Sequence, residues 1–221
     1  TASQRDSESG GRRTALRWLW LLPVLQVVWV NAHTLAVMGP VLCWMFVGAG
    51  VVEHIAKLPK GQMAKLMWGR AGRLVWAAAL VSVACLVNPY FVRGAMFPLL
   101  LWKEIQGGHV VSANIGEMKS PLAMPLSQWT WDLYAAAGLL VIGIASFAVR
   151  WRRVNLARLL VFAAGVYLAC KAQRNAGLFA VMGSWAVLRN IAESAPAMEG
   201  GVWRRAAAVG NVMIGAVLGF L

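Results

Sequence analysis

Long apolar runs recur along the whole sequence and are separated by short polar or basic segments. The runs lie at about 16–30, 35–52, 74–87, 134–149, 157–170, 176–188 and 206–221. A helix that crosses a bilayer needs about 20 apolar residues, so the flanks must extend the shorter runs. Because the runs lack the period-2 alternation of barrel strands, we expect helices. The sequence therefore predicts an all-α, polytopic transmembrane helix bundle of about seven spans.

The composition supports a membrane fold and argues against a soluble globule. Hydrophobic residues make up 60% of the chain and charged residues 13%, against about 25% charged in soluble domains. Most Trp residues lie near the ends of the runs, as in the aromatic belts of membrane interfaces. The three Cys residues lie in separate apolar runs, so neither a disulfide framework nor a zinc site is expected.

The charge of the chain is lopsided and indicates which side of the membrane each loop faces. Lys and Arg number 21 against 8 acidic residues. In a soluble protein this excess would indicate nucleic-acid binding, but here the basic residues lie between apolar runs, so no nucleic-acid partner is expected. With residues 1–15 as a cytoplasmic lead, the outer segments keep only Arg93, Lys103, Lys119, Lys171 and Arg174. The positive-inside rule selects this topology.

The sequence predicts a single membrane domain. Its bundle covers residues 16–221, and residues 88–133 form a long outer loop. Within that loop, the apolar stretch 91–102 is expected to lie along the outer surface. The chain begins without Met and ends inside an apolar run, so we expect a fragment of a longer protein.

The segment 157–188 has two interpretations, a hairpin of two short helices or one long tilted helix. A single helix would bring Lys171 and Arg174 near the middle of the membrane, at about 2.5–3.5 kcal/mol each. We therefore prefer the hairpin.

Polar residues that membrane helices normally avoid gather on the outer side of this topology. Four segments that are distant in sequence contribute them. The candidate binding residues are Asn31, His33, Asn88, Tyr90, Lys119, Lys171, Arg174 and Asn175, with Glu117 as the nearby carboxylate. A polar group without a partner costs several kcal/mol in a membrane, so we expect mutual pairing or a polar ligand in a shared outer vestibule.

Each candidate also has a structural interpretation. Asn88 precedes a proline, which disfavours helical geometry in the residue before it and so ends a helix. Asn31 and His33 can cap helix ends. Lys171 and Arg174 can extend to lipid head groups, although two cations on the side that is poor in basic residues also suggest an anionic partner such as a phosphate.

Four short motifs occur in order along the chain. They are Trp29-Val30-Asn31-Ala32-His33, Asn88-Pro89-Tyr90, Glu117-Met118-Lys119-Ser120-Pro121 and Arg174-Asn175. Together they resemble motifs of bacterial polytopic membrane proteins related to the GT-C glycosyltransferases. Those relatives carry glycine where this chain has Thr34 and Phe91.

The resemblance implies a protein of the bacterial inner membrane, surrounded by membrane lipid, that transfers a sugar from a polyprenyl-phosphate donor to an acceptor at the periplasmic face. Lys171 and Arg174 would clamp the donor phosphate. Glu117 would position the acceptor or contact a divalent metal, a cofactor that the resemblance alone allows. The remaining candidates would line the pocket. The catalytic acids of such enzymes usually lie in the first outer loop, where this chain has none, so we expect them upstream of Thr1.

Two other classes of function stay open. A transporter or flippase needs polar residues that continue through the membrane, whereas the runs here are apolar through their middles. A non-catalytic membrane scaffold predicts that the outer polar residues tolerate substitution. The sequence has no dinucleotide-binding loop, zinc-binding helix or Walker loop.

Overall fold

A computed structural model describes residues 19–55, 70–106 and 116–194. These residues form seven α-helices and no strand, which confirms the all-α prediction. The expected run 206–221 and the polar lead 1–15 lie outside the described residues. The chain divides into two compact units at residue 107, and each unit is described by itself.

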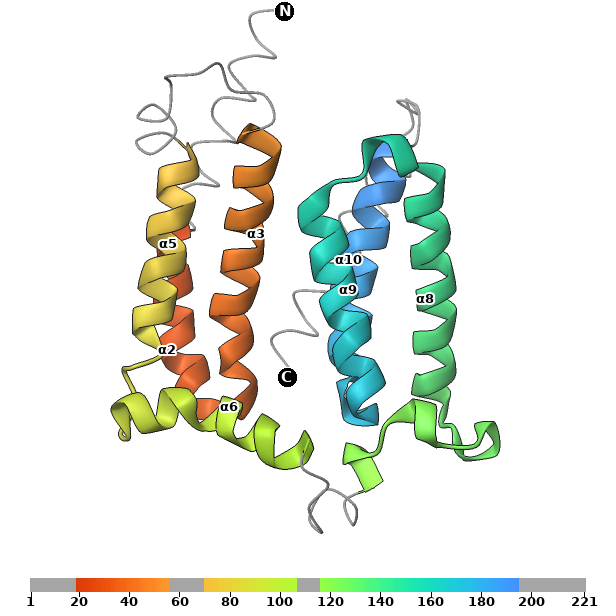
Figure 1. Ribbon diagram of the computed structural model, residues 1–221, viewed down its shortest axis with the longest axis horizontal. Coiled ribbons are helices and arrows are strands. Elements are labelled where there is room, and N and C mark those ends of the chain that lie inside the picture. Colours follow the sequence, from red (N-terminus) through yellow and green to blue (C-terminus); the bar gives the residue numbers. More distant parts are fainter. Residues whose placement is uncertain (1–18, 56–69, 107–115, 195–221) are drawn as a thin grey trace, which may run out of the picture. The chain divides into compact units, whose positions relative to one another are not determined.

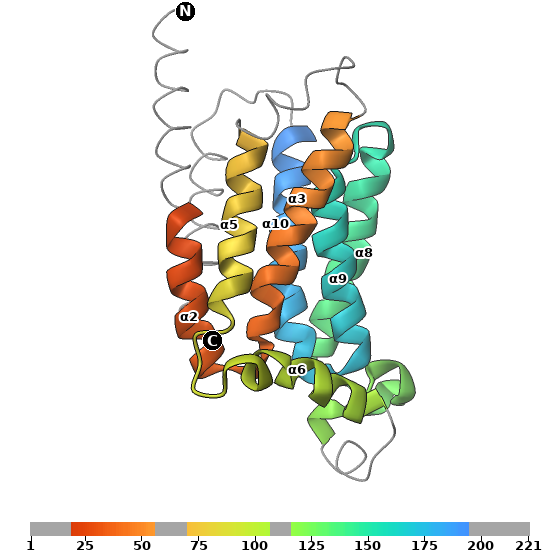
Figure 2. The same ribbon diagram turned by 60° about the vertical axis from the view of Figure 1, so that its left-hand side comes forward.

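Unit 1 has three helices packed side by side and a fourth that crosses their ends (Figure 1). The three are α2 (Leu22–Ala32), α3 (Met38–Ile55) and α5 (Arg70–Ala84), and α5 packs against both of the others. The fourth is α6 (Phe91–Gln106), which runs crosswise where α2 and α5 end and α3 begins (Figure 2). The stretch 91–102 was expected to lie along the outer surface. It lies within this crosswise helix, and its place on the outer side stays a prediction.

The face that α5 presents to its neighbours consists of small and medium side chains. Ala77, Ala78, Val81 and Ala84 are nearly fully buried, and their spacing places them on one side of the helix. Small residues let two helices approach closely, so that they can pack even where the hydrophobic effect does not drive them together. On the same helix Trp76 is 64% exposed, so α5 is covered on one side only.

Unit 2 contains α8 (Trp131–Val149), α9 (Leu156–Lys171) and α10 (Ala176–Ser194), with α10 packed against both of the others. The hairpin expected in 157–188 is confirmed, because α9 ends at Lys171 and a short turn leads into α10. Three single turns of 3-10 helix precede α8, at Gly116–Met118, Pro121–Ala123 and Leu126–Gln128.

The core of unit 2 is built on two phenylalanines and the glycines beside them. Phe162 and Phe179 are 5% and 2% exposed, and their ring centroids are 5.5 Å apart in an edge-on arrangement. A Cβ added at Gly143 would lie 2.2 Å from the ring of Phe162, and one at Gly183 would lie 2.9 Å from the ring of Phe179. Glycine is therefore needed where α8 and α10 meet these rings.

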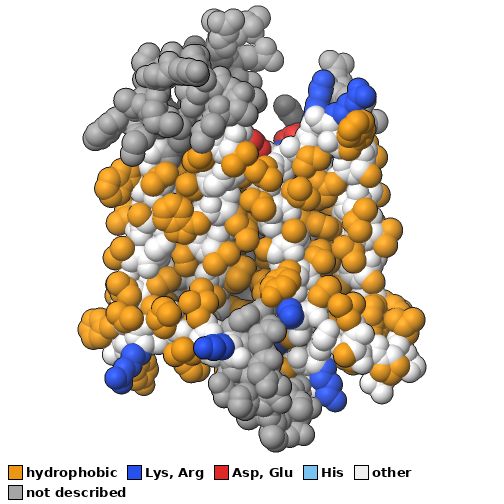
Figure 3. All heavy atoms as spheres, in the orientation of Figure 1, with side chains coloured by type: hydrophobic (Ala, Val, Ile, Leu, Met, Phe, Trp, Pro, Cys, Tyr) orange, Lys and Arg blue, Asp and Glu red, His pale blue; other side chains and the backbone are white. Residues whose placement is uncertain are grey.

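The helices carry long apolar surfaces. Within the described residues, two segments are long and apolar enough to cross a membrane, Thr34–Glu53 and Trp131–Val149, with mean hydropathies of 2.1 and 1.9. Only 22% and 17% of their most apolar windows are buried, whereas the core helix of a soluble protein would be mostly buried. Figure 3 shows hydrophobic side chains along the helices of each unit, with Lys and Arg near the helix ends.

Candidate functional site

Unit 1 contains a pocket of about 740 Å3 between α6 and the adjoining ends of the other helices. This volume is in the range of small-molecule sites, about 300–1,000 Å3. Four of the candidate binding residues line it: Asn31, His33, Asn88 and Tyr90. Its other described lining residues are Val30, Ala32, Thr34, Ala36, Val37, Pro40, Ser82, Cys85, Pro89, Arg93, Gly94, Ala95, Phe97 and Pro98.

Two asparagines build this pocket through bonds to the backbone. The Asn31 amide donates to Val27 O at 2.7 Å and to Val87 O at 2.8 Å, which ties the end of α2 to the segment after α5. The Asn88 amide donates to the carbonyls of Cys85 and Phe91, and its oxygen accepts from Tyr90 N at 2.8 Å. Since both amide groups already use their two hydrogens, these asparagines shape the pocket wall and have only oxygen atoms to offer a ligand.

His33 caps the 3-10 turn η2 (Thr34–Val37) that leads into α3. Its Nδ1 accepts a hydrogen bond from Leu35 N at 3.0 Å. In the neutral ring the hydrogen then lies on Nε2, which leaves one donor on the pocket wall. The capping interpretation is thus confirmed for His33, whereas Asn31 lies within α2 and bonds the carbonyls of Val27 and Val87. Capping does not prevent His33 from meeting a ligand.

A buried glutamine lies behind the pocket. Gln26 is 3% exposed and donates to Ala36 O at 2.8 Å and to Cys85 Sγ at 3.2 Å. Its partners both line the pocket, so Gln26 holds α2 against two parts of the wall. A Cβ at Gly39 would lie 1.9 Å from Gln26 Oε1, which explains a glycine there. The sequence analysis did not select Gln26 as a candidate. The available signal was a polar amide side chain within the apolar run at 16–30.

In unit 2, the segment before α8 is bonded to the turn between α9 and α10. Gln173 N donates to Lys119 O at 3.0 Å, and the Gln173 side chain donates to Gly116 O at 2.7 Å. The Ser120 hydroxyl donates to Cys170 O at 2.6 Å. The candidates of unit 2, which are distant in sequence, are therefore brought to one end of its helix bundle.

The candidate side chains at that end differ in their surroundings. Asn175 is 6% exposed and donates to Leu168 O at 2.9 Å, so it completes the end of α9. Lys171 Nζ lies 5.5 Å from the ring centroid of Tyr167. Glu117 and Lys119 are exposed, and so is Arg174. The cations are thus accessible to an anion, whereas Asn175 serves the fold.

The candidates form two groups, one in each unit. That both groups share one vestibule stays a prediction. Among the described residues no three His, Cys, Asp or Glu side chains come together in a way that could hold a metal ion.

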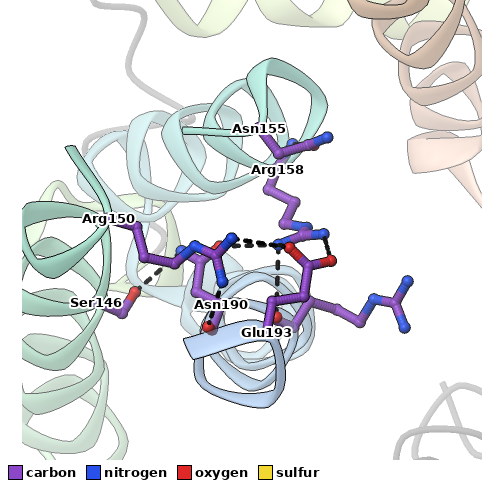
Figure 4. Close-up of polar contacts among 7 residues, drawn as sticks. Ser146, Arg150, Asn155, Arg158, Asn190 and Glu193 are labelled. Carbon is purple, nitrogen blue, oxygen red and sulfur yellow. Dashed lines mark hydrogen bonds and ion pairs between the residues drawn. The ribbon is translucent and has the colours of Figure 1, made fainter. Parts of the chain in front are cut away.

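A polar network that the sequence did not reveal lies at the opposite end of unit 2 (Figure 4). Arg158 is 7% exposed and forms a two-pronged ion pair with Glu193, together with a bond from Nη1 to Asn190 Oδ1 at 3.2 Å. Arg150 Nη2 lies 3.1 Å from Glu193 Oε2. Asn190 donates to the hydroxyl of Ser146 at 3.2 Å. The network links all three helices of unit 2.

Its electrostatics are dominated by one carboxylate among several arginines. The hydrogen bond from Arg158 lowers the pKa of Glu193, and the positive charges of Arg158, Arg150 and Arg189 act in the same direction. Partial burial opposes this shift in pKa without reversing it. Glu193 therefore keeps its negative charge under ordinary conditions.

The sequence did contain a signal for the buried arginine. Arg158 shares one face of α9 with Val161, Phe162 and Gly165, all of which are buried. An arginine on an apolar face predicts a partner on a neighbouring helix.

Comparisons of this chain with protein-family models, with curated proteins and with solved structures found no match.

Proposed function

We propose that this chain is a multi-pass protein of the bacterial inner membrane that transfers a sugar from a polyprenyl-phosphate donor at the periplasmic face. The observation that carries the proposal is the unit 1 pocket, because residues of the Trp29–His33 and Asn88–Tyr90 motifs line it. A pocket with apolar walls and a few polar groups suits a ligand that is part lipid and part sugar.

Insertion into a membrane is supported by the side chains that the helices leave uncovered. Val28 of α2, Trp76 of α5 and Val141 of α8 are 63%, 64% and 67% exposed. Removing a large apolar side chain from water is worth about 1.5–3 kcal/mol, so exposed faces of this extent favour lipid over water.

The predicted sidedness is supported within unit 2. One end of its bundle carries Arg150, Arg152 and Arg153 beside Trp151, which is 69% exposed and packs under the Arg152 guanidinium at 4.9 Å. Arginines with an exposed tryptophan are typical of a cytoplasmic interface. The other end then faces the periplasm and presents the candidate cations.

In this proposal Lys171 and Arg174 bind the donor phosphate and stabilise the negative charge that develops as the sugar leaves. Glu117 is the carboxylate that positions the acceptor. It lies in an exposed turn that Gln173 ties to the α9–α10 connection, through Gly116. The Glu117 carboxylate and the cations therefore belong to one end of one unit.

The topology is tested with cysteines placed at the two ends of unit 2. We expect Lys119→Cys to react with an impermeant thiol reagent on intact cells and Arg152→Cys to react only after lysis. Both positions are exposed, so access to the residue itself is matched. Labelling of Arg152→Cys on intact cells would contradict the proposed sidedness.

The reaction is tested with the full-length protein in proteoliposomes that contain polyprenyl-phosphate sugars. Arg174→Ala should lower sugar transfer by at least about tenfold, which corresponds to the loss of one charge-assisted contact. Arg152→Ala, which removes an arginine at the other end of unit 2, should leave transfer unchanged. Equal rates for Arg174→Ala and wild type would refute the clamp.

A further inference from the structure

Among the described residues that line the unit 1 pocket, one is an arginine and none is a lysine. The arginine is Arg93, in the first turn of α6. No Asp or Glu is found among those residues. Sequence reasoning counted Arg93 only as one of the few basic residues on the outer side. Its place in the pocket indicates that the pocket attracts an anion.

Three further donors are available on the same wall. The described hydrogen bonds use the hydrogens of Asn31 and Asn88, but not His33 Nε2, the Thr34 hydroxyl or the Tyr90 hydroxyl. One guanidinium with neutral donors around it is a set that matches a phosphate group, because arginine presents two parallel N–H groups to the phosphate oxygens.

The rest of the wall is apolar. Val30, Val37, Pro40, Phe97 and Pro98 all line the pocket. A free phosphate would leave these side chains in contact with water, whereas a hydrocarbon chain would cover them. The lining therefore fits an amphiphile with a phosphate at one end and an apolar chain attached.

We propose that the unit 1 pocket binds a phosphate-bearing lipid, with Arg93 as the ligand of the phosphate, and that it does so without the cations of unit 2. One arginine matches the single negative charge of a phosphodiester that joins a sugar to a lipid. The inference rests on the proposed function for the role of this pocket, and it adds a second lipid-phosphate site to the one at Lys171 and Arg174.

The test measures binding of farnesyl phosphate to the full-length protein by native mass spectrometry, with farnesol and inorganic phosphate as comparison ligands. Arg93→Gln should weaken farnesyl phosphate binding by at least about tenfold, and Arg93→Lys should fall between it and wild type. The matched control is Lys103→Gln on the same helix, because Lys103 is exposed and outside the described pocket lining. It should bind as wild type does.

Three results would overturn the inference. The first is Arg93→Gln binding within about twofold of wild type. The second is a pair Lys171→Gln and Arg174→Gln that binds no farnesyl phosphate at all, because the unit 1 pocket should still hold one molecule without those cations. The third is inorganic phosphate binding as well as farnesyl phosphate, which would make the pocket a site for free phosphate. Should Arg93→Gln fail to fold, Ala95→Phe fills the pocket without changing its charge and should also abolish binding.

Failure of this inference is distinguishable from failure of the proposed function. Suppose that the wild type transfers sugar and that Arg93→Gln does not change farnesyl phosphate binding. This result would refute the inference and would still support the proposed transferase function. Binding that depends on Arg93 in a protein without transfer activity would support the inference and count against the transferase.

Discussion

The ion pair between Arg158 and Glu193 gives the sharpest test of how unit 2 is held together. The perturbation is Glu193→Gln, which keeps the size of the side chain and removes its charge. Arg158 would then stay buried, with its side chain 8% exposed, facing one neutral amide oxygen in place of the carboxylate. Its other acceptors would be Asn190 Oδ1 and the carbonyl of Arg189.

The expected magnitude follows from the unequal burial of the two partners. Breaking a fully buried pair costs about 3–5 kcal/mol, and breaking an exposed pair costs about 0–1 kcal/mol. The Glu193 side chain is 43% exposed, so water screens part of the interaction. We therefore expect Glu193→Gln to lower the free energy of unfolding by about 2 kcal/mol, or the Tm by about 4–8 °C for a chain of this size.

The assay is thermal unfolding of the full-length protein in a mild detergent, followed by intrinsic tryptophan fluorescence. Glu117→Gln is the matched control, because it makes the same chemical change in an exposed turn and should leave the Tm unchanged. A double-mutant cycle with Arg158→Met isolates the coupling between the two residues. Additive effects of Glu193→Gln and Arg158→Met would refute the reasoning.

Three further predictions use the same assay. The stability lost on Glu193→Gln should be constant near neutral pH and should vanish in acid. The pKa of Glu193 is lower in the folded protein than its usual value of 4.5, so its charge stabilises the fold above that value and ceases to do so as the pH falls through the folded pKa. A difference in stability that persists in strong acid would contradict this. Gly143→Ala should destabilise by about 1–3 kcal/mol, since its Cβ would lie 2.2 Å from the Phe162 ring, whereas Gly138→Ala on the same helix meets open space and should be neutral or stabilising; equal effects would be a contradiction. Phe91 has φ of 48°, so Phe91→Gly should be more stable than Phe91→Ala by about 1 kcal/mol, and the reverse order would show that the left-handed backbone is not strained.

Helix positions could be predicted from the sequence because apolar runs bounded by polar residues have few alternatives in a membrane. The turn at Lys171–Asn175 was found for an energetic reason, the cost of placing Lys171 and Arg174 within a helix at mid-membrane. The structure places the turn there, from the end of α9 at Lys171 to the start of α10 at Ala176.

The candidate site was predictable only in part. The gathering of polar residues on the predicted outer side pointed to Asn31, His33, Asn88 and Tyr90, and all four line one pocket. The pocket role of Arg93 was not predictable, because it depends on α6 crossing the end of the bundle, and periodicity within one helix does not encode its angle to others. The partner of Arg158 was hidden for a similar reason, since Glu193 is 35 residues away and on another helix.

Bonds at both ends of α9 fix its register against its neighbours. Near the N-terminal end of α9, the Arg158 side chain donates a hydrogen bond to Asn190 of α10. Near its C-terminal end, the carbonyl of Cys170 accepts a hydrogen bond from the Ser120 hydroxyl. In the membrane that we propose for this protein, contacts between apolar helices would oppose lengthwise sliding mainly through shape, because lipid tails are as apolar as the side chains. A displacement of α9 by one turn, about 5.4 Å, would break both of these hydrogen bonds at once. We therefore expect α9 to resist piston-like displacement and to tilt only together with the helices it is tied to.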